Sequence, residues 1–363
     1  MEFGFLPGRR EEGNADGKSV GISGVAMKQI GIVIVHCGGE KILEDCVRTL
    51  EEQSYQQFRV WVVDNGSTDG SAGRVAGRHP RVAVIRLEEN LGWSGGNNVG
   101  IRAALAAGME WVWLLNDDTE VISDCLETMM NYAQGHSDVK ILSPVVKYAD
   151  PADRIWFQGG KVDVRRVEVN VCESLEEFQS LGGEVWPYIS GCAMMVHRDV
   201  FRRIGLIDER YFLYCEDVDF SVRAWRAGFG LAVVPDAELR HLVSYSTGGD
   251  KQENPFRLYH FLLSTMYFWR KFLGLKEFHR RFCPAYLSKR LCGSNGKQPS
   301  EVEWNVYADV LWHVLTLKQA ARKPTKSPHW FRRWLEHKPW SVIAVLGWDW
   351  QALCKSMGKR WKG

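Results

Sequence analysis

The chain has 363 residues, of which 45% are hydrophobic and 25% charged, so it has the composition of a globular protein with one large domain or two smaller ones. Its net charge of +2 conceals an asymmetry: from Lys251 onward, twenty-one Lys and Arg accompany seven Asp and Glu, which leaves the first 250 residues acidic. Apolar runs fall short of the roughly 20 residues of a membrane-spanning helix, and the N-terminus lacks a signal-peptide core. The nine scattered cysteines contain no C-x-x-C pair, which argues against a disulfide framework or a zinc site and favours a reducing compartment.

The chain begins with a leader and a predicted strand–helix–strand unit. Residues 1–27 are rich in glycine and charge without periodicity, which predicts a disordered leader, and Met27 is a candidate for the natural start. Ile30–Val35 and Phe58–Val63 are apolar runs typical of strands buried on both faces, and apolar residues recur at helical spacing over 43–50. Such a unit predicts a parallel strand pair with a right-handed crossover.

Polar segments follow the second and third predicted strands. Asp64–Ser71 begins where the second strand ends, and ligands of parallel sheets bind beyond the carboxyl ends of their strands. A plain turn that caps the next helix is the alternative. After the strand Val82–Leu87, the glycine-rich segment Asn90–Gly100 opens a helix, whose N-terminus favours anionic groups. A dinucleotide site is disfavoured, because these glycines follow the third strand and lack the G-x-G-x-x-G spacing.

A fourth buried strand, Trp111–Leu115, stops abruptly in Asn116-Asp117-Asp118. Carboxylate oxygens at the end of a buried strand suit a divalent cation and the diphosphate that it neutralises. An Asx turn that caps the next helix is the alternative.

The middle of the chain is predicted to be less regular. A strand over Val139–Val146 precedes a loop-rich, irregular insert at about 150–190, and order returns in a buried strand over Tyr188–Val196. Gly191 within that strand indicates a close approach of another group to the backbone.

A second acidic segment, Asp208–Phe220, precedes a helix predicted to begin near Glu216. The helix dipole favours carboxylates in its first turn, which would keep them ionised and able to accept a proton at neutral pH. For Asp217, complementing the charge of the helix end is one interpretation and catalysis is the other. Asp219 is instead assigned to a surface ion pair with Arg223, four residues later.

Beyond a short strand at Leu231–Pro235, His241 falls where the chain would return to the metal site. Residues 251–363 read as helical, basic and rich in tryptophan. A solvated basic face is one interpretation of that region, and peripheral contact with an anionic membrane surface or a lipid-linked acceptor is the other.

Together these motifs resemble the inverting family 2 glycosyltransferases over roughly Ile30–Thr247. The resemblance implies an α/β GT-A fold, with a mostly parallel twisted sheet flanked by helices and a helical basic C-terminal region. Within the family the motifs look most like those of bacterial rhamnosyltransferases. Their quoted segments are 62–71, 90–100, 115–119, 190–192 and 205–219.

The resemblance implies a role for each polar group. Asp217 would be the general base and Glu216 its supporting acid, while Asp118 and His241 would hold Mg²⁺ or Mn²⁺. The nucleotide-sugar donor would be bound by Asp64, Asn65, Ser67, Gly92, Asn97, Asn116 and Asp117. Two positions depart from the family pattern: Asn116 replaces the usual first aspartate, and His36-Cys37-Gly38 replaces a common Thr-Tyr-Asn.

The implied reaction is metal-dependent transfer of a rhamnose-like deoxysugar from a nucleotide diphosphate to a hydroxyl of a glycan, a lipid-linked glycan or a small natural product. Residues 28–150 would bind the nucleotide sugar, 151–250 would bind the acceptor and catalyse, and 251–363 would form a basic helical subdomain. A cytoplasmic enzyme without a nucleic-acid partner is expected, with peripheral contact at the inner face of the membrane and a homodimer left open. A nucleotidyltransferase and a non-catalytic sugar-nucleotide or carbohydrate-binding module are the alternatives.

Overall fold

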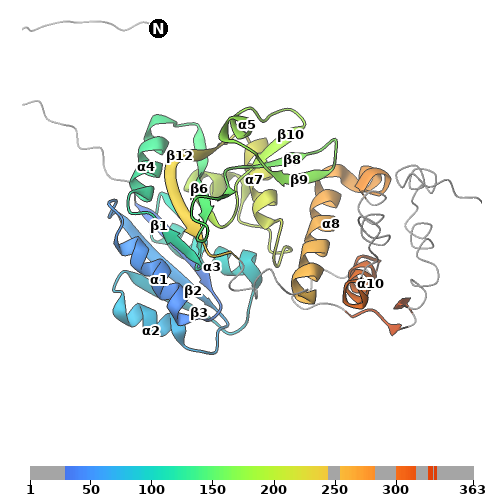
Figure 1. Cartoon of the computed structure of the whole chain (residues 1–363), viewed down its shortest axis with the longest axis horizontal. Coiled ribbons are helices and arrows are strands. Elements are labelled where there is room, and N and C mark those ends of the chain that lie inside the picture. The colour runs from blue at the N-terminus through green and yellow to red at the C-terminus, as the bar shows by residue number, and fades with distance from the viewer. Residues whose placement is uncertain (1–28, 244–253, 283–299, 316–325, 330, 333–363) are drawn as a thin grey trace, which may run out of the picture.

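The computed structural model describes residues 29–243, 254–282, 300–315, 326–329 and 331–332. The predicted leader, 1–27, and most of the region after residue 282 lie outside these ranges. A curled sheet with helices on both faces occupies one side of the molecule, and α8 and α10 lie at the side opposite α1 and α2 (Figure 1). No helix in the described ranges is long and apolar enough to cross a bilayer.

The main sheet follows the order β3-β2-β1-β4-β11-β6-β12-β5, with β7 paired to β6. Pairing is parallel from β3 to β4 and between β6 and β12, whereas β11 lies antiparallel between β4 and β6. The strands are β1 (Ile30–His36), β2 (Phe58–Asn65), β3 (Val82–Leu87), β4 (Trp111–Asn116), β5 (Thr119–Val121), β6 (Val139–Tyr148), β7 (Ile155–Phe157), β11 (Ala193–His197) and β12 (Gly230–His241).

The apolar runs form strands because both faces of the sheet are covered. Ile32 and Ile34 of β1 pack with Leu43 of α1 (Glu40–Glu51), while Val33 packs with Ile101 of α3 (Gly92–Ala106). All five side chains are fully buried. The remaining helices are α2 (Ser71–Arg78), α4 (Cys125–Gly135), α5 (Leu175–Gln179), α6 (Arg198–Ile204), α7 (Glu216–Arg226), α8 (Pro255–Glu277), the π-helix η2 (Phe278–Phe282) and α10 (Glu301–Leu315).

Three predictions about the middle of the chain are corrected. The insert at 150–190 is ordered, because β8 (Gly160–Asp163) pairs on its two sides with β9 (Glu168–Val171) and β10 (Val185–Tyr188) in an antiparallel sheet. The predicted strand over Tyr188–Val196 is two strands, since residues 189–192, with a turn at 191–192, separate β10 from β11. The short strand predicted at Leu231–Pro235 continues through a register shift to His241, which therefore lies on β12.

Candidate active site

Strand register gathers the predicted donor-binding residues at one edge of the sheet. His36 on β1 lies opposite Asp64 on β2, and Val35 lies opposite Asn116 on β4. Because these neighbouring strands are parallel, their carboxyl ends meet at the same edge. Asp64 and Asn116 therefore lie where the sequence predicted them, at the carboxyl ends of their strands.

The Asp64 segment and the glycine-rich segment are joined by hydrogen bonds. The buried Asp64 carboxylate accepts the Ser67 amide at 3.0 Å and also the Ser67 hydroxyl. The Asn65 side chain donates to the Gly92 carbonyl at 3.2 Å. Gly92 has a φ of +76°, and a Cβ there would lie 2.3 Å from the Phe212 carbonyl oxygen, so both backbone conformation and space require glycine.

Trp93, which sequence reasoning did not select, connects α3 to the end of β4. Its indole Nε1 donates to Asn116 Oδ1 at 3.2 Å, and its carbonyl accepts from Asn97 Nδ2 at 2.9 Å. Asn97 is thus bound within its own helix, and Asn116, where the family has an aspartate, orients the indole.

His36 is a second residue that sequence reasoning did not assign. It is fully buried, with Nδ1 2.7 Å from Asp117 Oδ2 and Nε2 2.7 Å from Ser71 Oγ. Burial raises the pKa of the Asp117 carboxyl, and the contact with His36 opposes that rise. His36, which stands where the family commonly has a Thr-Tyr-Asn segment, therefore provides a partner for Asp117. The signal available in the sequence was a polar residue at the end of a fully apolar strand.

Asp118 and His241, the two predicted metal ligands, face each other. His241 Nε2 lies 3.1 Å from Asp118 Oδ1, and both side chains are buried. Burial acts to lower the pKa of His241, but Cys192 and Asp118 outweigh it and raise that pKa to about 10. Metal binding requires the neutral imidazole and therefore competes with protonation of His241.

These residues fit a divalent cation that is shared with a diphosphate. Within the described ranges, no group of three or more His, Cys, Asp and Glu side chains could hold a metal. A carboxylate oxygen and an imidazole nitrogen nevertheless suit a cation whose other ligands are substrate phosphates and water, as is common for Mg²⁺. These two ligand atoms thus agree with a cation that binds together with the nucleotide sugar.

Glu216 and Asp217 occupy the first turn of α7, as predicted. Asp217 Oδ2 accepts the Gly191 amide at 2.9 Å, and its Oδ1 accepts the Val218 amide at 2.8 Å. A Cβ on Gly191 would lie 2.6 Å from the Trp93 ring and 3.3 Å from Asp217 Cβ, which confirms the predicted close approach at this glycine. Asp217 is thereby linked through Gly191 and Trp93 to Asn116.

Burial opposes the effect that the sequence assigns to the helix dipole at these two acids. Burial raises the pKa of Asp217, although the amides of Gly191 and Val218 oppose the rise. Burial, and then the neighbouring Asp217, raise the pKa of Glu216 well above its ordinary value. Among the described residues Glu216 Oε2 has no hydrogen-bond partner. The raised pKa makes Asp217 a stronger base once it is ionised.

The burial of Glu216 predicts a pH-dependent stability change in Glu216→Gln. A carboxyl whose pKa is raised by folding contributes stability below its unfolded pKa of about 4.3 and loses it as the pH rises through the folded pKa. The variant should therefore match the wild type near pH 4 and melt at a higher temperature near neutral pH. Thermal melts across this range test the prediction, and a Tm difference that did not change with pH would contradict it.

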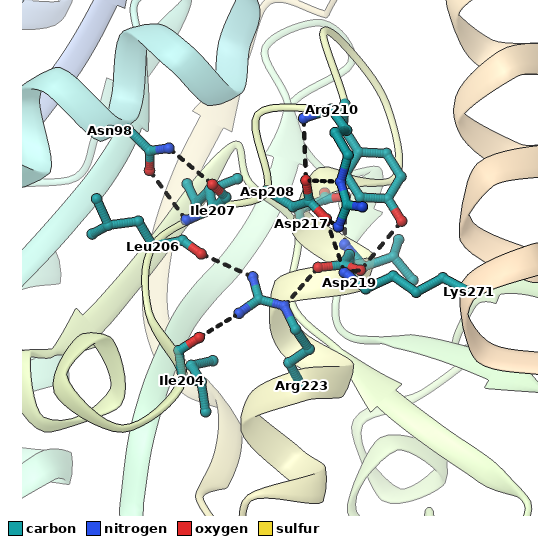
Figure 2. A network of polar contacts seen from close by, with 12 residues as sticks. Asn98, Ile204, Leu206, Ile207, Asp208, Arg210, Asp217, Asp219, Arg223 and Lys271 are labelled. Atoms are coloured by element: carbon teal, nitrogen blue, oxygen red, sulfur yellow. Dashed lines mark hydrogen bonds and ion pairs between the residues drawn. The ribbon is translucent and has the colours of Figure 1, made fainter. Parts of the chain in front are cut away.

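Asp219 does pair with Arg223, at 2.7 Å, but the predicted surface location is wrong because the carboxylate is fully buried. Figure 2 shows Lys271 and Arg223 approaching it from different sides. Tyr211 OH also donates to it, at 3.2 Å. The guanidinium of Arg223 continues to the carbonyls of Ile204 and Leu206. The buried Asp219 therefore helps to hold the preceding loop against α7.

Residues 31–205 match the protein-family model described as "Glycosyl transferase family 2". Over these residues, just under half of the chain, the sequence is similar to family 2 glycosyltransferases. The glycosyltransferase prediction is thereby confirmed. The match covers the motifs predicted to bind the donor and continues through β11 and α6, but it ends before Asp217 and α8.

Curated relatives of this glycosyltransferase domain share about a quarter of its sequence. The N-acetylglucosaminyl-diphospho-decaprenol L-rhamnosyltransferase of Mycobacterium tuberculosis is 27% identical over 237 residues, covering 57% of this chain and 74% of the relative. The dTDP-rhamnosyl transferase RfbF of Shigella flexneri is 24% identical, covering 61% and 69%. The galactofuranosyltransferase GlfT1 of M. tuberculosis is 28% identical, covering 58% and 68%.

Solved structures agree on the GT-A fold. Staphylococcus aureus TarS aligns with a TM-score of 0.51 at 14% identity over 88% of this chain, and GalNAc-T7 with UDP, GalNAc and Mn²⁺ aligns with 0.53 at 13% identity over 80%. The chain spans 54% and 59% of those two proteins. The predicted fold class is confirmed.

Proposed function

We propose that the chain is an inverting, metal-dependent glycosyltransferase that moves a rhamnose-like deoxysugar from a nucleotide diphosphate to a hydroxyl acceptor. The observation that carries the proposal is the position of Asp217. Its carboxylate is held by the Gly191 amide, and through Trp93 this region joins the end of β4, where the Asn116-Asp117-Asp118 turn begins. The proposed base and the proposed site for the departing diphosphate thus lie in one continuous series of contacts.

In the proposed reaction, Asp217 removes the proton of the acceptor hydroxyl while that oxygen attacks the anomeric carbon, so the proton ends on Asp217 and the diphosphate leaves from the opposite face. Direct displacement inverts the anomeric configuration. Asp118 and His241 would hold the cation, which supplies charge neutralisation to the leaving diphosphate when bound. Asp64 and Asn65 would orient the nucleoside, and His36 would hold Asp117 in place.

The deoxysugar and the acceptor class are supported by the relatives. Two of them have rhamnosyltransferase names, and the mycobacterial name specifies an acceptor on a polyprenyl diphosphate. We extend both features to this chain as a proposal: a dTDP-linked deoxyhexose as donor, and a lipid-linked glycan as acceptor. The basic C-terminal region would bring the enzyme to the membrane surface that carries such an acceptor.

Calorimetric titration of dTDP-, UDP- and GDP-sugars, each with and without Mn²⁺, tests the donor class. We expect one nucleotide class to bind, and to bind more tightly with Mn²⁺, because the cation connects Asp118 and His241 to the diphosphate. Equal affinity with and without the cation would reject metal dependence. Failure of every donor to bind, even with acceptor present, would reject the proposed activity.

A further inference from the structure

We infer that α8, which lies beyond the matched domain, positions the Glu216–Asp217 pair by clamping the loop before it, and that Lys271 is the main positioning residue. The inference rests on the proposed role of Asp217 as the base. It gives α8, which lies outside the residues matched by the family model, a role in turnover.

The segment that needs this support is the turn before α7. Tyr214 and Cys215 are consecutive residues with φ of +71° and +63°, a conformation that side chains with a Cβ rarely adopt. Cys215 is also the N-cap of α7, without a side-chain hydrogen bond to the helix. Such a backbone persists only where its surroundings enforce it. The direction in which α7 presents Asp217 depends on this turn.

Several side chains of α8 hold the loop on the N-terminal side of that turn. The buried Ser264 donates to the Leu213 carbonyl at 2.8 Å, and Arg257 Nε donates to the Tyr214 hydroxyl at 3.0 Å. The Phe212 ring stacks on His260 with centroids 4.7 Å apart. The Phe212 carbonyl in turn accepts the Trp93 amide at 2.9 Å, so the clamped loop also touches the glycine-rich segment.

Lys271 connects the two ends of the segment that contains the turn. Its ammonium contacts Asp208, ahead of the turn, and Asp219, inside α7, as Figure 2 shows. Asp219 is fully buried and Asp208 is 12% exposed, so these ion pairs are shielded from water. Lys271 itself is 26% exposed, and its charge is used internally instead of belonging to a solvated basic face. One cation thus ties α8 to the helix that carries Asp217.

The test compares Lys271→Met with Arg270→Met, which removes the neighbouring, exposed charge of the same helix. We expect Lys271→Met to lower kcat by about 10- to 100-fold with donor Kd unchanged, because small displacements of a reacting group have effects of that size. Lys271→Arg should recover most of the loss, since a guanidinium can also bridge two carboxylates. Arg270→Met should behave as wild type.

Ser264→Ala provides a second variant that removes one hydrogen bond and little packing. Its kcat should fall about three- to tenfold, the size expected for one lost hydrogen bond, also with donor Kd unchanged. Wild-type kcat in both folded variants, or a loss of donor affinity as large as the loss of kcat, would overturn the inference. Should Lys271→Met not fold, Ser264→Ala decides.

Asp217→Asn in the same assay separates this inference from the proposed function. If Asp217→Asn is inactive while Lys271→Met and Ser264→Ala turn over normally, the clamp is wrong and the base assignment stands. If Asp217→Asn remains active, the base assignment is wrong, and a kcat loss confined to Lys271→Met and Ser264→Ala would still place control of turnover in α8.

Discussion

Asp217→Asn is expected to lower kcat by about 10²–10⁴-fold while donor affinity stays near the wild-type value. The amide keeps the size of the side chain, and its oxygen can still accept one of the two backbone N–H groups that hold Asp217, from Gly191 and Val218. What it loses is the capacity to take the acceptor's proton. Steady-state kinetics and calorimetry on the same preparation separate these two quantities.

Asp199→Asn is a matched control for this variant. Asp199 is also a first-turn acid, in α6, but its side chain is 48% exposed and forms ion pairs with His197 and Arg202. Its isosteric replacement should leave kcat unchanged. Near-wild-type turnover of Asp217→Asn would show that another group accepts the proton.

In the wild type, the acidic limb of the pH–kcat profile should lie above the ordinary Asp pKa of about 3.9, because burial raises the pKa of Asp217.

Asp118→Asn is expected to abolish the effect of Mn²⁺ on donor affinity and to lower kcat by at least about 10²-fold. The carboxylate is the only anionic member of the pair with His241, and a cation held by it contributes several kcal/mol to stabilising charge on the departing diphosphate. Donor titrations with and without Mn²⁺ measure the first effect, and saturating kinetics measure the second.

Asp124→Asn serves as the control for Asp118→Asn, because Asp124 is exposed at the N-cap of α4 and makes no side-chain cap bond. It should retain the full Mn²⁺ response. If Asp118→Asn also kept that response, the cation would be held elsewhere, and the pairing of Asp118 with His241 would be structural only.

The sequence was sufficient to place the polar residues at the ends of β2 and β4, because the information that locates them is local. The apolar runs of β1, β2 and β4 end at polar residues, and parallel pairing necessarily brings those ends together. Asp64, Asn116 and their neighbours could therefore be placed without knowing any long-range contact. The same reasoning failed for Asp219, because the spacing to Arg223 predicts a pair on any helix face and cannot say which face is buried.

By itself, the sequence determined the strands β1 to β4, the helix that starts at Glu216 and the family that the motifs resemble, since periodicity and motif order lie within short stretches. Only the tertiary structure decided that His36 contacts Asp117 across 81 residues and that Lys271 reaches Asp219 across 52. It also decided that β11 runs antiparallel between β4 and β6. These features depend on how distant elements pack against one another, and the residues around each contact do not specify which distant element they will meet.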